Sequence, residues 1–206
     1  MYMYIHTNVN HLPFINNFRD INVCTQSGLL TDDEAKYVTR LHCYKFYSQK
    51  EAHQLPTHIE FLKMSSIINS YIEFTNLTHL HISYSKRRYS TSHEHTLSVL
   101  PENLVCVKLY GTFNQPIRGL LPPNLKRLTL GDYFTQEIDD TLPEYLEYLK
   151  FGIRFNDQVY GYLPRTLKYL EFGNRFRQPI GDHLPDGLEV LVFGKDGYRE
   201  RCNMTY

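Results

Sequence analysis

Residues 163–193 read Leu163-Pro-Arg-Thr-Leu-Lys-Tyr-Leu-Glu-Phe-Gly-Asn-Arg-Phe-Arg-Gln-Pro-Ile-Gly-Asp-His183 and then begin again with Leu184-Pro-Asp-Gly-Leu-Glu-Val-Leu-Val-Phe193. The same Leu-Pro pair recurs every 21 residues along the second half of the chain. Its five copies begin at Leu100, Leu121, Leu142, Leu163 and Leu184. A fixed period of about 20–50 residues is the sequence signature of a stacked repeat architecture. The chain is therefore predicted to be a solenoid in which each repeat forms one coil.

Each repeat contains a short segment with the residue spacing of a half-buried strand. Its first, fourth and sixth residues are apolar, and the alternation over the last three is the period of a strand with one buried face. Residues 18–23 carry a degenerate copy of this segment. The eight clear copies begin at Val38, Ile59, Leu77, Leu104, Leu125, Leu146, Leu167 and Leu188. We therefore predict a repeat solenoid with one curved parallel β-sheet of about eight or nine strands.

The rest of each repeat carries three further columns of equivalent residues. A glycine follows the strand in four repeats, which suits a tight corner or a positive φ angle. Proline precedes two of the aliphatic residues, and proline has no N–H to donate to a central strand ladder. The second side of the coil is therefore predicted to be irregular, with little helix. The columns are Gly131, Gly152, Gly173 and Gly194; Phe113, Phe134, Phe155 and Phe176; and Ile117, Ile138, Val159 and Ile180.

Both ends of the chain and one internal stretch depart from the repeat. Thr31-Asp-Asp-Glu34 matches a capping box and predicts a short helix at residues 32–37. A solenoid needs its end coils shielded from water, so the irregular termini are interpreted as caps. The predicted segments are a cap at 1–37, a solenoid at 38–194 with a projecting polar insertion at 85–95, and a C-terminal cap or tail at 195–206.

Composition and charge limit the classes of function. The 206 residues include 22 basic and 22 acidic ones, and this balance gives no sign of general affinity for nucleic acids or membranes. We find neither a signal peptide nor a window of about 18 apolar residues, the length of a membrane span. The four cysteines lack metal-binding spacing and indicate reduced thiols. We therefore predict a cytoplasmic protein that is not secreted and does not enter membranes.

The consensus of the repeats resembles a known family. The pattern Leu-Pro-x-x-Leu-x-x-Leu-x-Phe-Gly-x-x-Phe-Asn-x-Pro-Ile is similar to the FNIP repeat, and Phe113-Asn-Gln-Pro-Ile117 comes closest to it. The resemblance covers residues 100–194 well and residues 38–99 loosely. It implies a leucine-rich-repeat-like solenoid of the kind found in social amoebae and in giant viruses. It also implies a protein-interaction role, with neither enzymatic activity nor a cofactor.

The residues between the buried positions of each strand are expected to point out of the concave face of the sheet. They form two columns, and the first is rich in arginine and aromatic residues, which are typical anchors of protein interfaces. The second column is mainly basic from Lys63 to Lys150, although the chain is neutral overall. We therefore predict a surface that binds an acidic segment of another protein. Its residues are Arg40, His42, Phe61, Lys63, His79, His81, Lys108, Arg127, Tyr148, Lys150 and Tyr169.

Three other interpretations stay open at this point. Residues 84–89 place Lys86-Arg-Arg88 between two tyrosines, a pattern that with the lysines of the concave face suits nucleic-acid binding. The resemblance also implies a substrate adaptor of a ubiquitin ligase, because some viral members carry an N-terminal F-box. Residues 1–37 are too short and insufficiently helical for an F-box. The third interpretation is a solvated face without a partner.

No group of residues indicates catalysis or metal binding. His79 and His81 share one face of a strand, but His42 lies two strands away, about 9.6 Å, which is too far to complete a zinc site. No motif marks a catalytic nucleophile. Cys106 is predicted to point outward beside Lys108, which would lower its pKa. We therefore assign no catalytic, metal-binding or cofactor-binding residue.

Overall fold

The computed structural model of the chain describes residues 2–5, 20–23, 38–43, 56–65, 74–84, 97–159, 161–180 and 184–194. These residues fall into two compact units, residues 1–104 and residues 105–206, which are described in turn. The predicted helix at 32–37, the insertion at 85–95 and the C-terminal segment at 195–206 lie outside the described residues.

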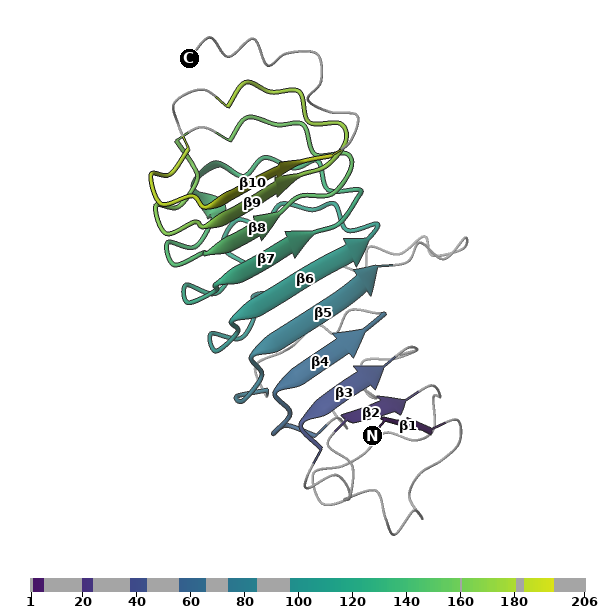
Figure 1. The fold of residues 1–206 in the computed structure, drawn as a ribbon. Coiled ribbons are helices and arrows are strands. Elements are labelled where there is room, and N and C mark those ends of the chain that lie inside the picture. Colours follow the sequence, from purple (N-terminus) through teal and green to yellow (C-terminus); the bar gives the residue numbers. More distant parts are fainter. Residues whose placement is uncertain are drawn as a thin grey trace. The chain divides into compact units, whose positions relative to one another are not determined.

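The first unit is a stack of five parallel strands that follow one another in chain order (Figure 1). β2 confirms the degenerate copy of the strand segment at residues 18–23. β1 was not predicted, because only the second and third apolar positions of the segment, Met3 and Ile5, are present in it. The strands are β1 (Tyr2–Ile5), β2 (Asp20–Val23), β3 (Arg40–Cys43), β4 (Phe61–Met64) and β5 (His79–Tyr84).

The second unit repeats this arrangement with five more parallel strands. Equivalent residues lie in register across the strands: Val107 pairs with Leu128, Leu128 with Leu149, and Leu149 with Leu170. The predicted parallel, leucine-rich-repeat-like solenoid is thereby confirmed. The strands are β6 (Cys106–Gly111), β7 (Arg127–Leu130), β8 (Tyr148–Lys150), β9 (Tyr169–Phe172) and β10 (Val190–Phe193).

Three hydrogen-bonded turns carry the chain of the second unit from one strand to the next. The Leu-Pro pair opens the turn that precedes each strand. Gly131 and Gly173 open the second turn, and Ile117, Ile138 and Val159 open the third. The bonds in the coil that follows Leu121 are Leu125 N–H to the Pro122 carbonyl, Phe134 N–H to the Gly131 carbonyl and Thr141 N–H to the Ile138 carbonyl, at 3.1–3.3 Å. The second side is thus irregular, as predicted. The only helical element among the described residues is η2 (Asp139–Thr141).

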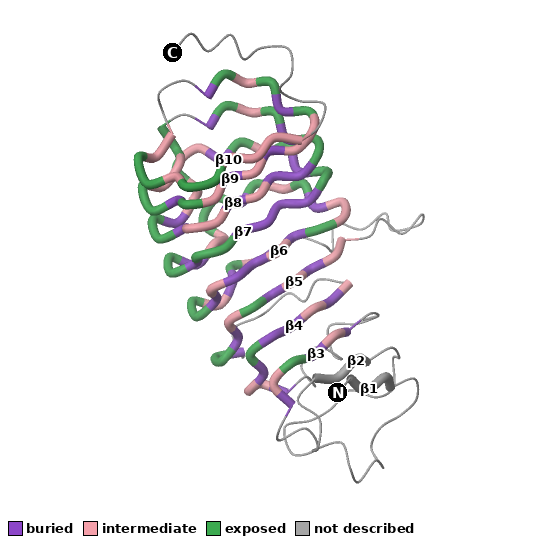
Figure 2. The backbone as a smooth tube through the Cα atoms, viewed as in Figure 1, coloured by how far each residue is buried: buried purple, intermediate pink, exposed green. Residues whose placement is uncertain are grey.

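Two columns of phenylalanine rings fill the core of the second unit. The rings of Phe113, Phe134, Phe155 and Phe176 stack with centroids 6.0–6.2 Å apart. The rings of Phe151, Phe172 and Phe193 on the strands stack at 5.6 Å and meet the first column at 3.8 Å. Such pairs contribute about 0.5–1.5 kcal/mol each beyond the burial of their area. Figure 2 shows the buried residues alternating with more exposed ones along the strands.

The glycine column lies where neighbouring coils approach most closely. A methyl group on Gly152 would overlap the carbonyl group of Gly131, and one on Gly173 would overlap the carbonyl group of Gly152. None of the four glycines has a positive φ; that conformation occurs at Gly111, Gly119 and Gly161. Gly131 and Gly173 open hydrogen-bonded turns, so the expected tight corner is present. Glycine is needed here mainly because the backbone of the preceding coil lies too close for a side chain.

Asparagine side chains join successive coils at the corner that follows the first phenylalanine column. The Asn114 Oδ1 atom accepts a hydrogen bond from the Thr135 N–H at 2.9 Å, and Asn156 Oδ1 accepts one from the Arg177 N–H at 2.7 Å. Each bond spans 21 residues, or one coil. The Phe-Asn dipeptide of the repeat thus combines a core ring with a side chain that satisfies a backbone N–H of the next coil.

The close contact at Gly152 leads to a test of the stacking. Gly152→Ala is expected to lower the free energy of unfolding by about 3 kcal/mol, because the added methyl group must push two coils apart. Urea unfolding followed by circular dichroism measures the change.

Gly187→Ala is the matched control, since the nearest atom to its new methyl group would be the Arg165 carbonyl oxygen at 3.8 Å. This variant is expected to stay within about 0.5 kcal/mol of the wild type, as a surface substitution does. Equal stabilities of the two variants would contradict the close contact between coils.

Candidate partner-binding face

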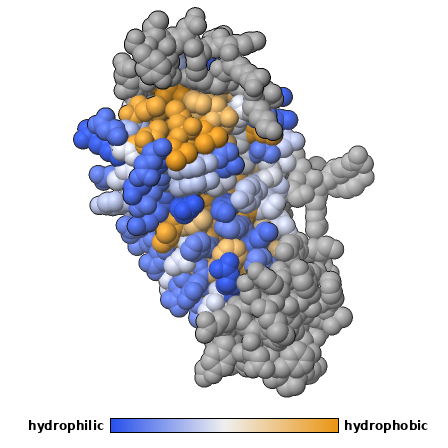
Figure 3. All heavy atoms as spheres, viewed as in Figure 1, coloured by the Kyte–Doolittle hydropathy of each residue, from blue (hydrophilic) through white to orange (hydrophobic). Residues whose placement is uncertain are grey.

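The strands of the second unit present one face on which outward side chains form rows across the coils. We call this face the outer face of unit 2. Figure 3 shows that it is hydrophilic over much of its area, with apolar surface gathered near the C-terminal strands. Its side chains come from positions that alternate with apolar residues, which are buried in β6 to β9 and half-buried in β10. They are Lys108, Tyr110, Arg127, Tyr148, Lys150, Tyr169, Glu171, Val190 and Val192, whereas Thr129, at the equivalent position of β7, is buried.

A continuous row of stacked side chains crosses β7, β8 and β9. The Arg127 guanidinium lies 4.6 Å from the centroid of the Tyr148 ring. The Tyr148 ring in turn stacks on Tyr169 at 4.4 Å with an interplanar angle of 10°. The structure thus brings three of the predicted binding residues together. The contacts of each side chain with the next hold the row in place.

In a second row, the carboxylate of Glu171 lies next to Lys150, one of the lysines predicted to bind an acidic partner. The Lys150 Nζ atom donates to Glu171 Oε1 at 2.6 Å, and the Tyr169 hydroxyl donates to Glu171 Oε2 at 2.8 Å. The hydrogen bond to Glu171 raises the pKa of Lys150 above its usual value, and it does the same for the pKa of Tyr169. Lys150 was predicted as a cation for an acidic partner, but its charge is already balanced by Glu171.

The first unit packs its outward residues around a single phenylalanine. The Arg40 guanidinium lies 4.3 Å from the centroid of the Phe61 ring, and the His42 and His81 rings lie 5.1 and 4.8 Å from it. Phe61 was predicted as an outward residue of the binding face, but only 6% of it is exposed; its role in binding stays a prediction. Its neighbours cover it because three strands place large side chains at adjacent positions; the third predicted histidine, His79, has its ring 6.3 Å away. Lys63 on β4 is half-buried.

Cys106 also differs from its prediction. It was expected to be exposed beside Lys108 with a lowered pKa, but it is 3% exposed. Burial raises the pKa of its thiol, and this effect outweighs the opposing influence of Lys108 and Arg127. Cys43, which was predicted to be in the core, is buried and its pKa is raised for the same reason. Burial therefore makes both thiols poor nucleophiles.

Two exposed residues of the outer face were left out of the predicted site. Tyr110 is 37% exposed and Val190 is 42% exposed. The sequence contains a signal for both, because Tyr110 lies two residues after Lys108 on the same strand face, and Val190 is in register with Tyr169.

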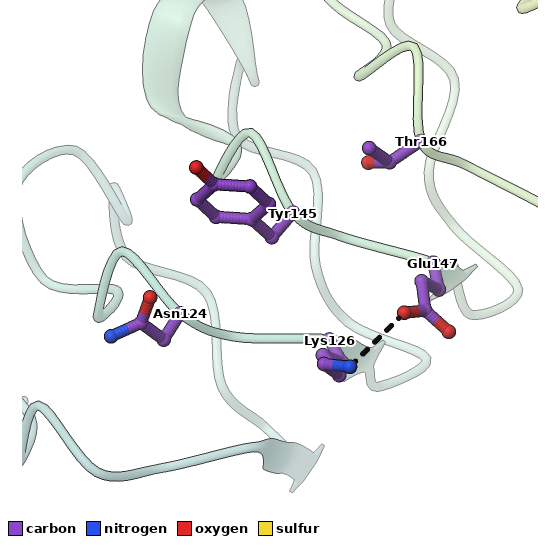
Figure 4. Close-up of a pocket in the computed structure, with 5 residues that line it drawn as sticks. All are labelled: Asn124, Lys126, Tyr145, Glu147 and Thr166. Carbon is purple, nitrogen blue, oxygen red and sulfur yellow. Dashed lines mark ion pairs between the residues drawn. The ribbon is translucent and has the colours of Figure 1, made fainter.

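An open depression of about 260 Å³ lies beside the strands, at the residues that precede them (Figure 4). An ion pair of 3.3 Å joins Lys126 to Glu147 within it, and both side chains are about half exposed. This depression was not predicted, although its residues recur at the repeat spacing of 21. It is lined by Asn124, Lys126, Tyr145, Glu147 and Thr166.

The described residues contain no group of three or more side chains placed to hold a metal ion. Within the same ranges, no helix has the length and hydropathy that a membrane span requires. The basic stretch proposed as a nucleic-acid contact, residues 84–89, is described only at Tyr84.

These coils and their parallel register define a repeat solenoid of the leucine-rich-repeat type. A model of the FNIP repeat matches three overlapping segments, residues 113–153, 138–175 and 155–196. This match over residues 113–196 confirms the resemblance to the FNIP repeat seen in the sequence.

A solved structure described as CroV588, a novel circular leucine-rich-repeat protein, is similar with a TM-score of 0.65 and 26% sequence identity. The similarity covers 86% of this chain but only 27% of CroV588, so the chain spans about a quarter of that protein's length. The comparison with curated proteins gives no match.

Burial of the two described cysteines predicts low thiol reactivity. In a Cys24→Ser, Cys202→Ser variant, Cys43 and Cys106 are expected to react with a disulfide reagent at pH 8 about 100-fold more slowly in the folded protein than in denaturant. Absorbance of the released thiolate measures the rate.

The burial of Cys43 and Cys106 also determines how the free energy of unfolding changes with pH. Above about pH 9, the usual pKa, thiols of the unfolded chain release protons while the buried thiols keep theirs, so the free energy of unfolding falls as the pH rises. Reaction of Cys106 in the folded protein at the rate of a free cysteine would contradict both its burial and this pH effect.

Proposed function

We propose that the chain is a non-enzymatic protein-binding module whose outer face of unit 2 binds an acidic segment of another protein. The observation that carries the proposal is the stacked row of Arg127, Tyr148 and Tyr169. Arginine and tyrosine are among the residues that contribute most to binding energy at protein interfaces. We also propose a reducing, cytoplasmic location, which the free thiols of Cys43 and Cys106 support.

The side chains of the row are already held in place, and this favours a role in binding over a face that only contacts water. A side chain that must be immobilised on binding costs about 0.5–1.5 kcal/mol. Arg127, Tyr148 and Tyr169 are already held by their mutual contacts and by the hydrogen bond from Tyr169 to Glu171. A partner therefore meets a surface whose conformation is largely set before contact.

The charges of the face favour an acidic partner. Among the described residues, neither Lys108 nor Arg127 forms an ion pair, whereas Lys150 is neutralised by Glu171. The unbalanced positive charge is thus on β6 and β7. Complementary charge mainly increases the rate of association and excludes wrong partners.

Charge reversal on β6 and β7 tests the proposal. A Lys108→Glu, Arg127→Glu variant is expected to lose at least about tenfold in the amount of native partner that it captures from a cell lysate, because two attractive contacts become repulsive. Quantitative mass spectrometry of the captured proteins measures the loss, and circular dichroism verifies that the variant is folded.

Arg165→Glu, in the turn that precedes β9, changes charge in the same sense outside the outer face and is expected to keep the partner. Adding Lys150→Glu to the double variant should reduce capture further, because it places a second carboxylate next to Glu171. A partner that is captured equally by the wild type and the double variant would reject binding at this face.

A further inference from the structure

The outer face of unit 2 has two chemically different ends. β6 and β7 carry Lys108 and Arg127, neither of which forms an ion pair within the described part of the chain. β10 carries valine at both outward positions, Val190 and Val192, and Val190 is 42% exposed. Figure 3 shows this contrast as apolar surface near the last strands and hydrophilic surface beyond it.

The strands between these ends form a neutral bridge. Glu171 accepts hydrogen bonds from Lys150 through one oxygen and from the Tyr169 hydroxyl through the other. Its negative charge is therefore compensated and would not repel an acidic partner. The stacked Tyr148 and Tyr169 rings continue the row from Arg127 towards Val190.

The spacing of the strands sets the distance between the two ends. Neighbouring strands lie about 4.8 Å apart, so β7 and β10 are separated by about 14 Å and β6 and β10 by about 19 Å. An extended polypeptide advances about 3.3 Å per residue. A segment that crosses the strands therefore spans these distances with about four to six residues.

We infer that the outer face of unit 2 selects an extended polypeptide that carries acidic residues and, about four to six positions away, an aliphatic residue. This inference rests on the proposed function. The carboxylates pair with Lys108 and Arg127, the intervening residues lie over the two tyrosines, and the aliphatic side chain covers Val190. Two anchors at a fixed separation give specificity that neither charge nor apolar contact provides alone.

Fluorescein-labelled peptides test the two anchors and their spacing on the full chain. The matched peptide carries Glu-Glu, three Gly or Ser residues and Leu; a second peptide has the same composition with Leu next to the glutamates; a third replaces Glu-Glu by Lys-Lys. Fluorescence anisotropy is expected to show the matched peptide binding at least about tenfold more tightly than either of the others. Equal affinity for the matched and respaced peptides would overturn the inference.

Variants of the chain assign each anchor. Lys108→Glu, Arg127→Glu is expected to reverse the preference, so that the Lys-Lys peptide binds more tightly than the Glu-Glu peptide. In Val190→Asp, replacing the peptide's Leu by Ser is expected to have no further effect, whereas in the wild type it weakens binding about tenfold. Arg165→Glu is the control and should bind all peptides as the wild type does.

The outcomes separate this inference from the proposed function. If the charge-reversed variant loses its cellular partner but the wild type does not distinguish the peptides, the outer face binds a partner of other chemistry and the inference fails alone. If no variant changes either peptide or partner binding, both fail. Tighter binding of a single-stranded oligonucleotide than of the matched peptide would also overturn the inference.

Discussion

The distance between the backbones of successive coils is the constraint on which the rest of the structure depends. Gly131, Gly152 and Gly173 leave so little space that a single methyl group on either of the last two would overlap the preceding coil. At that separation the phenylalanine rings stack and the asparagine side chains reach the next backbone N–H. A single coil has too little core to fold alone, so packing against its neighbours supplies most of the stability.

The same constraint creates the candidate binding face. Because strands of the second unit stay in register, residues one coil apart lie side by side, and chemically similar residues in the sequence become rows on the surface. Arg127, Tyr148 and Tyr169 form such a row, and Lys150 and Glu171 form a second. A change of residue type between coils then changes the chemistry along the face, as at the valines of β10.

The fold could be predicted from the sequence because the repeat leaves one arrangement of its apolar residues. The buried positions and the irregular second side follow directly from the spacing. The site could be predicted only as a set of outward positions, since exposure depends on neighbours in other coils. Phe61 is covered by Arg40, His42 and His81 from the neighbouring strands, Cys106 is buried, and Lys150 is neutralised by Glu171, 21 residues away. Pairing of this kind depends on rotamers, which spacing does not specify.

The most direct measurement of the stacking is the unfolding of a chain that lacks one coil. Deleting residues 125–145 removes one full period of 21 residues and brings Asn114 next to Asn156 and Phe113 next to Phe155. If the coils are interchangeable, the shortened protein is expected to fold, with the circular dichroism spectrum of parallel strands and a single, less stable urea transition. Deleting only residues 125–134 is predicted to abolish cooperative unfolding. Equal effects of the two deletions would contradict a stack built of interchangeable coils.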